Sequence, residues 1–202
     1  MGQSILIIIS WLCLIFVSGI NLIVFFGLFG IFLSILSYLI FFVEKFNYIK
    51  IRIFSFFDSS SKNNFQSEKA SEAIIDGGFF GKGIGEGTLN SKIPEAHTDY
   101  IVSVISEEFG IIIILLIMIS FVFFAYNIFK KIRYTNDNVF KLILVGLISL
   151  LMMQAFIHVG VNLRVLPTTG MTLPYLSYGG SSIISISIIS GIILNLTKRR
   201  VY

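Results

Sequence analysis

The sequence has 202 residues, of which 55% are hydrophobic and only 13% are charged, with a formal net charge of +4. Soluble domains contain about one quarter charged residues, so this composition excludes an ordinary soluble globular protein and indicates a membrane protein. The only cysteine, Cys13, excludes a disulfide framework and a thiolate metal site.

Charged residues are absent from four stretches, 1–43, 109–129, 142–163 and 165–197. A membrane span needs about 20 apolar residues, so the first stretch is long enough for two spans, separated near residues 18–21. We therefore predict an all-α polytopic membrane bundle with five spans, near residues 4–18, 22–43, 102–129, 140–163 and 178–197. The predicted organisation is two spans in 1–43, a long extracytoplasmic loop in 44–101 and three spans in 102–202.

Basic residues in the short connections predict the orientation. One cluster lies between the third and fourth predicted spans and another closes the chain (Lys130, Lys131, Arg133 and Lys141; Lys198, Arg199 and Arg200). Short basic segments mark the cytoplasmic side, so the C-terminus is expected in the cytoplasm and residues 44–101 outside. This placement favours membrane topology over nucleic-acid binding as the reason for the positive charge. Met1 would then lie outside without a charged leader region, so we expect the sequence to be the C-terminal part of a longer protein.

The predicted outer loop contains three different kinds of segment. Residues 44–52 mix aromatic and basic side chains, which is typical of a surface-lying helix or the end of a span. Residues 58–66 are polar and predict an exposed turn or loop. Six glycines between residues 77 and 87 could cradle a phosphate, but the segment matches neither the dinucleotide-binding pattern nor the P-loop. Tight backbone near the membrane surface is the favoured interpretation.

Residues 93–110 concentrate acidic and imidazole groups where a polar loop enters an apolar span. Thr98 or Asp99 is expected to cap the helix that follows. On that helix Asp99, Ser103, Ser106 and Gly110 would share one narrow face. Two interpretations stay open: a helix start with its charges in water, or a carboxylate held at the membrane surface above a groove of small residues.

A polar stripe is predicted in the fourth span, because Gln154, His158 and Asn162 recur every four residues. The stripe could be hydrogen-bonding glue between helices or could mark a functional path. In either case we expect it to face the protein rather than lipid. A metal site at His158 is not expected, since no second histidine or carboxylate lies near it in sequence.

The segment 164–178 contains two of the three prolines and predicts a re-entrant or interfacial loop. Ser177, Ser181 and Ser185 follow at intervals of four residues. They would place small side chains on one helix face, which permits close helix packing.

Four segments together resemble the SEDS family of bacterial membrane glycosyltransferases, whose members include FtsW, RodA and SpoVE. They are Gly77-Gly78-Phe79-Phe80-Gly81-Lys82-Gly83, Pro94-Glu95-Ala96-His97-Thr98-Asp99-Tyr100, Glu107-Glu108-Phe109-Gly110, and Leu166-Pro167-Thr168-Thr169-Gly170 through Ser181-Ser182. The family fold has ten spans, so five would be present here. The segment around Asp99 is more similar to the FtsW branch. Ser59, where Pro is common, and Thr169, where Lys is common, depart from the family pattern.

The resemblance implies an enzyme that polymerises lipid II, an undecaprenyl-diphosphate disaccharide-peptide, with a class B penicillin-binding protein and other division proteins. It also implies the bacterial inner membrane, at the division septum for an FtsW-like protein. Asp99 matches the family's catalytic Asp and could accept a proton from the attacking hydroxyl. A divalent cation, Mg²⁺ or Mn²⁺, could bind at Asp99; no organic cofactor is expected. Lys82, Lys92 and Arg164 could assist the leaving diphosphate.

Other residues of these segments are weaker candidates for substrate binding: Glu95, His97, Ser103, Glu107, Thr168, Ser177 and Ser181. Glu95 and Glu107 compete with Asp99 as the reactive carboxylate, but Glu107 would lie deeper and Glu95 in a flexible approach. Three alternatives remain: a lipid II flippase that uses the polar stripe, a non-catalytic remnant that only binds its partner, and a RodA-like role in elongation.

Overall fold

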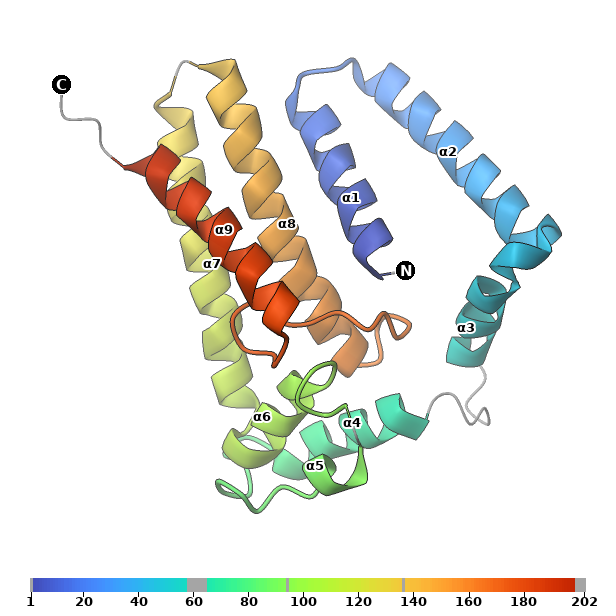
Figure 1. The fold of residues 1–202 in the computed structure, drawn as a ribbon, viewed down its shortest axis with the longest axis vertical. Coiled ribbons are helices and arrows are strands. Elements are labelled where there is room, and N and C mark those ends of the chain that lie inside the picture. Colours follow the sequence, from blue (N-terminus) through green and yellow to red (C-terminus); the bar gives the residue numbers. More distant parts are fainter. Residues whose placement is uncertain (1, 58–64, 94, 136, 199–202) are drawn as a thin grey trace.

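The computed structural model describes residues 2–57, 65–93, 95–135 and 137–198, and this part of the chain is helical without strands. Its elements are α1 (Gly2–Val17), α2 (Leu22–Phe42), the 3-10 helix η1 (Glu44–Phe46), α3 (Asn47–Phe57), α4 (Phe65–Gly77), α5 (Leu89–Lys92), α6 (Ile101–Phe109), α7 (Ile111–Arg133), α8 (Asn138–Asn162) and α9 (Gly180–Thr197) (Figure 1). The all-α prediction is confirmed. Most of the loop predicted at 58–66 lies outside the described residues, and its last two residues already belong to α4.

Four of the described helices, α2, α7, α8 and α9, are long and apolar enough to cross a membrane. The first predicted span corresponds to α1, which is apolar but has only 16 residues. The described helices therefore include four of spanning length against the five spans predicted, and a shorter apolar helix lies at the first.

Helix α8 is the centre of the bundle. It lies beside α7 and α9, and α1 packs along it (Figure 1). Leu144, Ile148 and Leu151 of α8 are almost completely buried and meet Ala125 of α7 and Ile193 of α9 in the largest apolar cluster. No residue of α2 is buried, which a predominantly apolar helix tolerates in lipid.

The third predicted span is not continuous, because the chain breaks at Gly110 between α6 and α7. Gly110 has φ 84°, and a Cβ there would overlap the carbonyl oxygen of Phe79. The Ile111 N–H donates to the Gly78 carbonyl at 3.0 Å. Helix α6 therefore turns away from α7 and forms, with α4 and α5, a layer across one end of the bundle (Figure 1).

The glycine-rich segment packs tightly against the end of α6. The N–H groups of Lys82 and Gly83 donate to the carbonyls of Glu107 and Glu108 at 2.9 and 3.1 Å. At Gly81, where φ is 79°, a Cβ would overlap the Glu108 carbonyl oxygen. Close backbone approach accounts for glycine here, as the sequence favoured, and gives no support to a phosphate cradle.

Candidate functional site

Asp99 lies in a turn, residues 95–100, immediately before α6. The N-cap position of α6 is Tyr100, without a capping side-chain hydrogen bond, so the capping role predicted for Thr98 or Asp99 is wrong. Asp99 also does not share a helix face with Ser103, Ser106 and Gly110, since the helix begins after it. Ala96 and Tyr100 anchor the turn in a buried apolar cluster with α4 and α5.

Asp99 and Glu95 line a small polar cavity of about 110 Å³ between the turn, α3, α4 and the loop after α8. No described residue donates a hydrogen bond to the Asp99 carboxylate. The position that a Cβ on Gly170 would occupy lies 3.5 Å from Asp99 Oδ2. Partial burial raises the pKa of Asp99 above its ordinary value of 3.8, and the nearby Glu95 carboxylate raises that pKa further. The cavity therefore holds an unpartnered carboxylate with an increased affinity for a proton.

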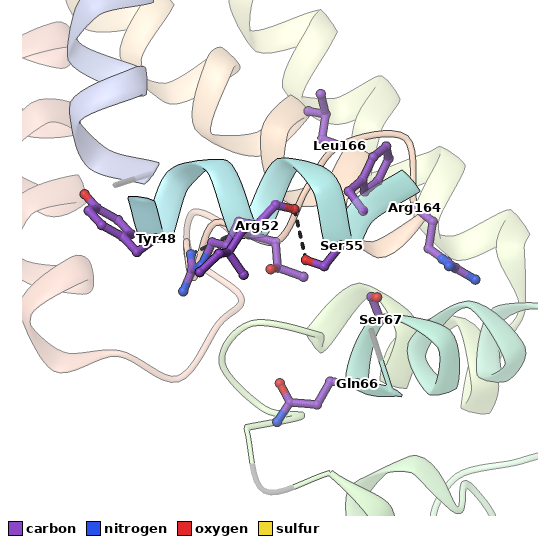
Figure 2. Close-up of a pocket in the computed structure, with 10 residues that line it drawn as sticks. Tyr48, Arg52, Ser55, Gln66, Ser67, Arg164 and Leu166 are labelled. Atoms are coloured by element: carbon purple, nitrogen blue, oxygen red, sulfur yellow. Dashed lines mark hydrogen bonds between the residues drawn. The ribbon is translucent and has the colours of Figure 1, made fainter. Parts of the chain in front are cut away.

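A second cavity of about 350 Å³ adjoins the first and shares Arg52, Gln66 and Thr168 with it. Figure 2 shows Arg52 and Ser55 of α3 opposite Gln66 and Ser67 of α4, with Arg164 at the edge. Arg52 Nη1 donates to the Thr168 carbonyl at 3.2 Å. The two cavities together form a groove in which Asp99 and Glu95 line the smaller cavity, Arg164 lines the larger one and Arg52 lines both.

Arg164 is held in an unusual backbone conformation, with φ 56°. This left-handed conformation costs a residue other than glycine about 1–3 kcal/mol, and such residues cluster at ligand sites. Its guanidinium group pairs with Glu68 of α4 at 3.4 Å. Arg164 is thus a predicted cation that does line the groove.

The other two predicted cations lie outside the groove. Lys82 pairs with Asp76 and Glu107 at 3.3 Å each, and Lys92 donates to Thr88 Oγ1 at 2.9 Å. Burial alone would lower the pKa of Lys82, but the hydrogen bonds that its ammonium group donates to the Asp76 and Glu107 carboxylates outweigh burial and raise the pKa. Neither Lys82 nor Lys92 lines the two cavities around Asp99, and their role at the substrate stays a prediction. Sequence reasoning missed Arg52 and Gln66; the only indication was the basic, aromatic composition of residues 44–52.

Glu107 holds the glycine-rich segment in place. Its carboxylate is buried and accepts hydrogen bonds from the N–H groups of Thr88 and Leu89 at 2.9 and 3.0 Å, besides the contact with Lys82. Burial would raise the pKa of Glu107, but these hydrogen bonds together lower it below 4.5. Because both of its oxygens already accept hydrogen bonds from protein donors, Glu107 is a weaker candidate than Asp99 for the reactive carboxylate.

The polar stripe of α8 faces the protein, as predicted. Gln154 Nε2 donates to the Thr172 carbonyl at 2.8 Å, and His158 Nδ1 bonds the Met171 carbonyl at 2.6 Å. Asn162 accepts from Ser103 Oγ at 2.8 Å. The stripe joins α8 to the following loop and to α6, which supports the interpretation as hydrogen-bonding glue.

The remaining candidates divide into three groups. Thr168 lines both cavities, whereas Ser103 and Ser177 are buried behind the Asp99 turn. The exposed side chains of His97 and Ser181 line neither cavity.

Among the described residues, no group of three or more His, Cys, Asp or Glu side chains could hold a metal ion. Asp99 and Glu95 line the same cavity, and their two carboxylates could hold one metal ion between them.

These features define a helical membrane protein with an acidic and cationic groove at one end of its bundle. The profile of the family described as "Cell cycle protein" (FtsW, RodA, SpoVE) matches residues 1–202. The chain therefore belongs to this family, and the resemblance found in the sequence is confirmed.

Curated relatives carry the name "Probable peptidoglycan glycosyltransferase FtsW". The chain is 35% identical to that of Caulobacter vibrioides over 199 residues, covering 98% of this chain and 50% of the relative. It is 34% identical to that of Nitrosomonas europaea over 210 residues, covering 99% and 54%. The chain thus spans about half the length of these relatives.

A solved structure supports the fold. A solved chain from the work "Structural coordination of polymerization and crosslinking by a peptidoglycan synthase complex" matches this protein with a TM-score of 0.72 and 24% sequence identity. The match covers 97% of this chain and 54% of the solved chain.

Proposed function

We propose that this chain forms part of a membrane glycosyltransferase that polymerises lipid II into glycan strands during bacterial cell division. The observation that carries the proposal is the Asp99 carboxylate, which has no hydrogen-bond donor among the described residues and faces a groove with two arginines. The names of the curated relatives support the same reaction class. By family resemblance the partner is a class B penicillin-binding protein, and the location is the cytoplasmic membrane at the septum.

In the proposed reaction, a sugar hydroxyl of one lipid II attacks the anomeric carbon of the glycan held on the other lipid diphosphate. The new bond joins that hydroxyl oxygen to the anomeric carbon, and the bond from this carbon to the diphosphate oxygen breaks. Asp99 accepts the hydroxyl proton, and the diphosphate leaves with the electron pair. A positioned general base contributes about 10²–10⁴-fold, and the raised pKa of Asp99 makes it a stronger base than an ordinary carboxylate.

Arg52 and Arg164 are suited to the diphosphate, since guanidinium groups bind phosphate oxygens in pairs of hydrogen bonds. If Mg²⁺ or Mn²⁺ binds, Asp99 would act as its ligand with Glu95 instead of as the general base, and the cation would neutralise developing negative charge. Mg²⁺ commonly binds one or two carboxylates together with substrate phosphates, so the two-carboxylate cavity fits that requirement.

The flippase alternative is less well supported. A flippase needs polar side chains that line a path through the bilayer, but Gln154, His158 and Asn162 are hydrogen-bonded to loop or α6 atoms.

A septal rather than side-wall position of a fluorescent fusion would separate a division role from elongation.

The proposal is tested by polymerisation of labelled lipid II with the purified full-length native protein and its partner. Arg52→Ala should reduce glycan synthesis at least tenfold, because it removes a cation from the groove. Lys92→Ala is the matched control, since Lys92 lies outside the groove, and should remain within about twofold. Equal activity of the two variants would contradict a role of the groove in polymerisation.

A further inference from the structure

The backbone around Asp99 is held from outside its own segment. Three successive carbonyl groups, those of His97, Thr98 and Asp99, accept hydrogen bonds from Tyr178 N–H at 3.1 Å, Ser177 Oγ at 2.7 Å and Asn162 Nδ2 at 3.1 Å. The donors come from the end of α8 and from the loop before α9. The main chain is thus fixed on both sides of a residue whose own carboxylate is unpartnered.

Asn162 is fully buried and uses both ends of its side-chain amide. Its Oδ1 accepts from the N–H and Oγ of Ser103 at 3.2 and 2.8 Å, and its Nδ2 also donates to the His158 carbonyl at 2.8 Å. One side chain therefore joins the last turn of α8, the first turn of α6 and the carbonyl of Asp99. Removing it would leave buried groups unpaired on both helices.

Ser177 connects the loop to the same turn. Its hydroxyl accepts from the Leu173 N–H at 2.8 Å while it donates to Thr98. The loop is itself fastened to α8, because His158 and Gln154 bond the carbonyls of Met171 and Thr172. The polar stripe and Ser177 therefore act on the Asp99 turn through one connected set of hydrogen bonds.

We propose that Asn162 and Ser177 are positioning residues, which hold the Asp99 turn so that its free carboxylate stays in the cavity. The inference rests on the proposed function, since it assigns a role in that reaction. Neither side chain lines the cavity, so each acts through the backbone of residues 97–99. Misplacement of a reacting group by about 1 Å can cost about 10²-fold in rate.

The test compares Ser177→Ala with Ser182→Ala in the full-length native protein, using labelled lipid II over a range of pH. Ser182 bonds Thr172 in the same loop at 2.7 Å and does not touch residues 97–99, so it is the matched control. We expect Ser177→Ala to lower turnover at saturating lipid II about 10- to 100-fold with little change in KM. The acid limb of its pH–activity profile should move to lower pH, because the carboxylate of Asp99 becomes more hydrated once the turn is released. Asn162→Ala, compared per amount of folded protein, should show the same two changes.

Loss of folded protein alone would lower the amplitude of activity without moving the acid limb. If Ser177→Ala and Ser182→Ala have equal turnover and equal acid limbs, while Asp99→Asn is inactive, the positioning role is wrong and the proposed function stands. If Asp99→Asn itself remains active, the role of Asp99 in the proposed function fails.

Discussion

At the scale of single residues, Glu107 and Asp99 show how position decides the role of a carboxylate. Glu107 lies only eight residues further along the chain, yet its oxygens are occupied by Thr88, Leu89 and Lys82. Hydrogen bonds to the ionised form lower the pKa of Glu107, whereas burial without donors raises the pKa of Asp99. The first carboxylate stabilises the fold, and the second is available for chemistry.

We predict that Glu107→Gln lowers the free energy of unfolding by about 1–3 kcal/mol, because an amide cannot accept at both oxygens and leaves a buried donor unpaired. The folded-state pKa of Glu107 is depressed, so its contribution is present above the unfolded value of about 4.5 and is lost as pH falls through the folded pKa. Thermal unfolding in detergent at pH 7 and at acidic pH measures both effects. Indistinguishable unfolding of variant and wild type at pH 7 would contradict the structural role.

Glu95 provides a second prediction, on pH dependence. Its charge helps to raise the pKa of Asp99, and a general base works only when ionised, so activity should fall as pH drops through that raised pKa. Glu95→Gln should move the acid limb of the polymerisation profile to lower pH. An unmoved limb would show that Glu95 does not act on the reacting carboxylate.

At the scale of elements, the break between α6 and α7 decides where the Asp99 layer lies. Gly110→Ala should destabilise the protein by at least about 1–3 kcal/mol, because the position has φ 84° and a Cβ would overlap the Phe79 carbonyl oxygen. Gly191→Ala within α9 is the matched control, with no atom within 4 Å of its added Cβ. It should be neutral or slightly stabilising in the same unfolding assay. Equal stability of the two variants would contradict the described junction.

The apolar runs predict the existence of the helices, because hydrophobic length is a local property. They do not predict the break at Gly110, since the reason for it, the Phe79 carbonyl, is distant in sequence. The same limit applies to the cations: Lys82 and Lys92 are near Asp99 in sequence but are bonded elsewhere, whereas Arg52 reaches the groove only through the fold. The inward direction of the polar stripe is predictable from helical spacing, but its partners are not.

At the scale of the whole molecule, the groove functions as proposed only if its end of the bundle lies outside the cell. In a Cys13→Ser background, we predict that Ser91→Cys reacts with an impermeant thiol reagent in spheroplasts and that Tyr134→Cys does not. Both side chains are exposed; Ser91 belongs to α5 and Tyr134 directly follows α7, and α5 and this end of α7 lie at opposite ends of the bundle (Figure 1). Reaction at residue 134 but not at residue 91 would reverse the topology and end the case for extracytoplasmic polymerisation.

The central claim is that the Asp99 carboxylate accepts the proton of the attacking hydroxyl. The most direct measurement is the polymerisation of labelled lipid II by purified full-length Asp99→Asn, which keeps the shape of the side chain but removes its basicity. Loss of a general base predicts a decrease of at least about 10²- to 10⁴-fold, with expression and partner binding retained. Glycan synthesis within tenfold of wild type would contradict the claim and place the chemistry at another residue.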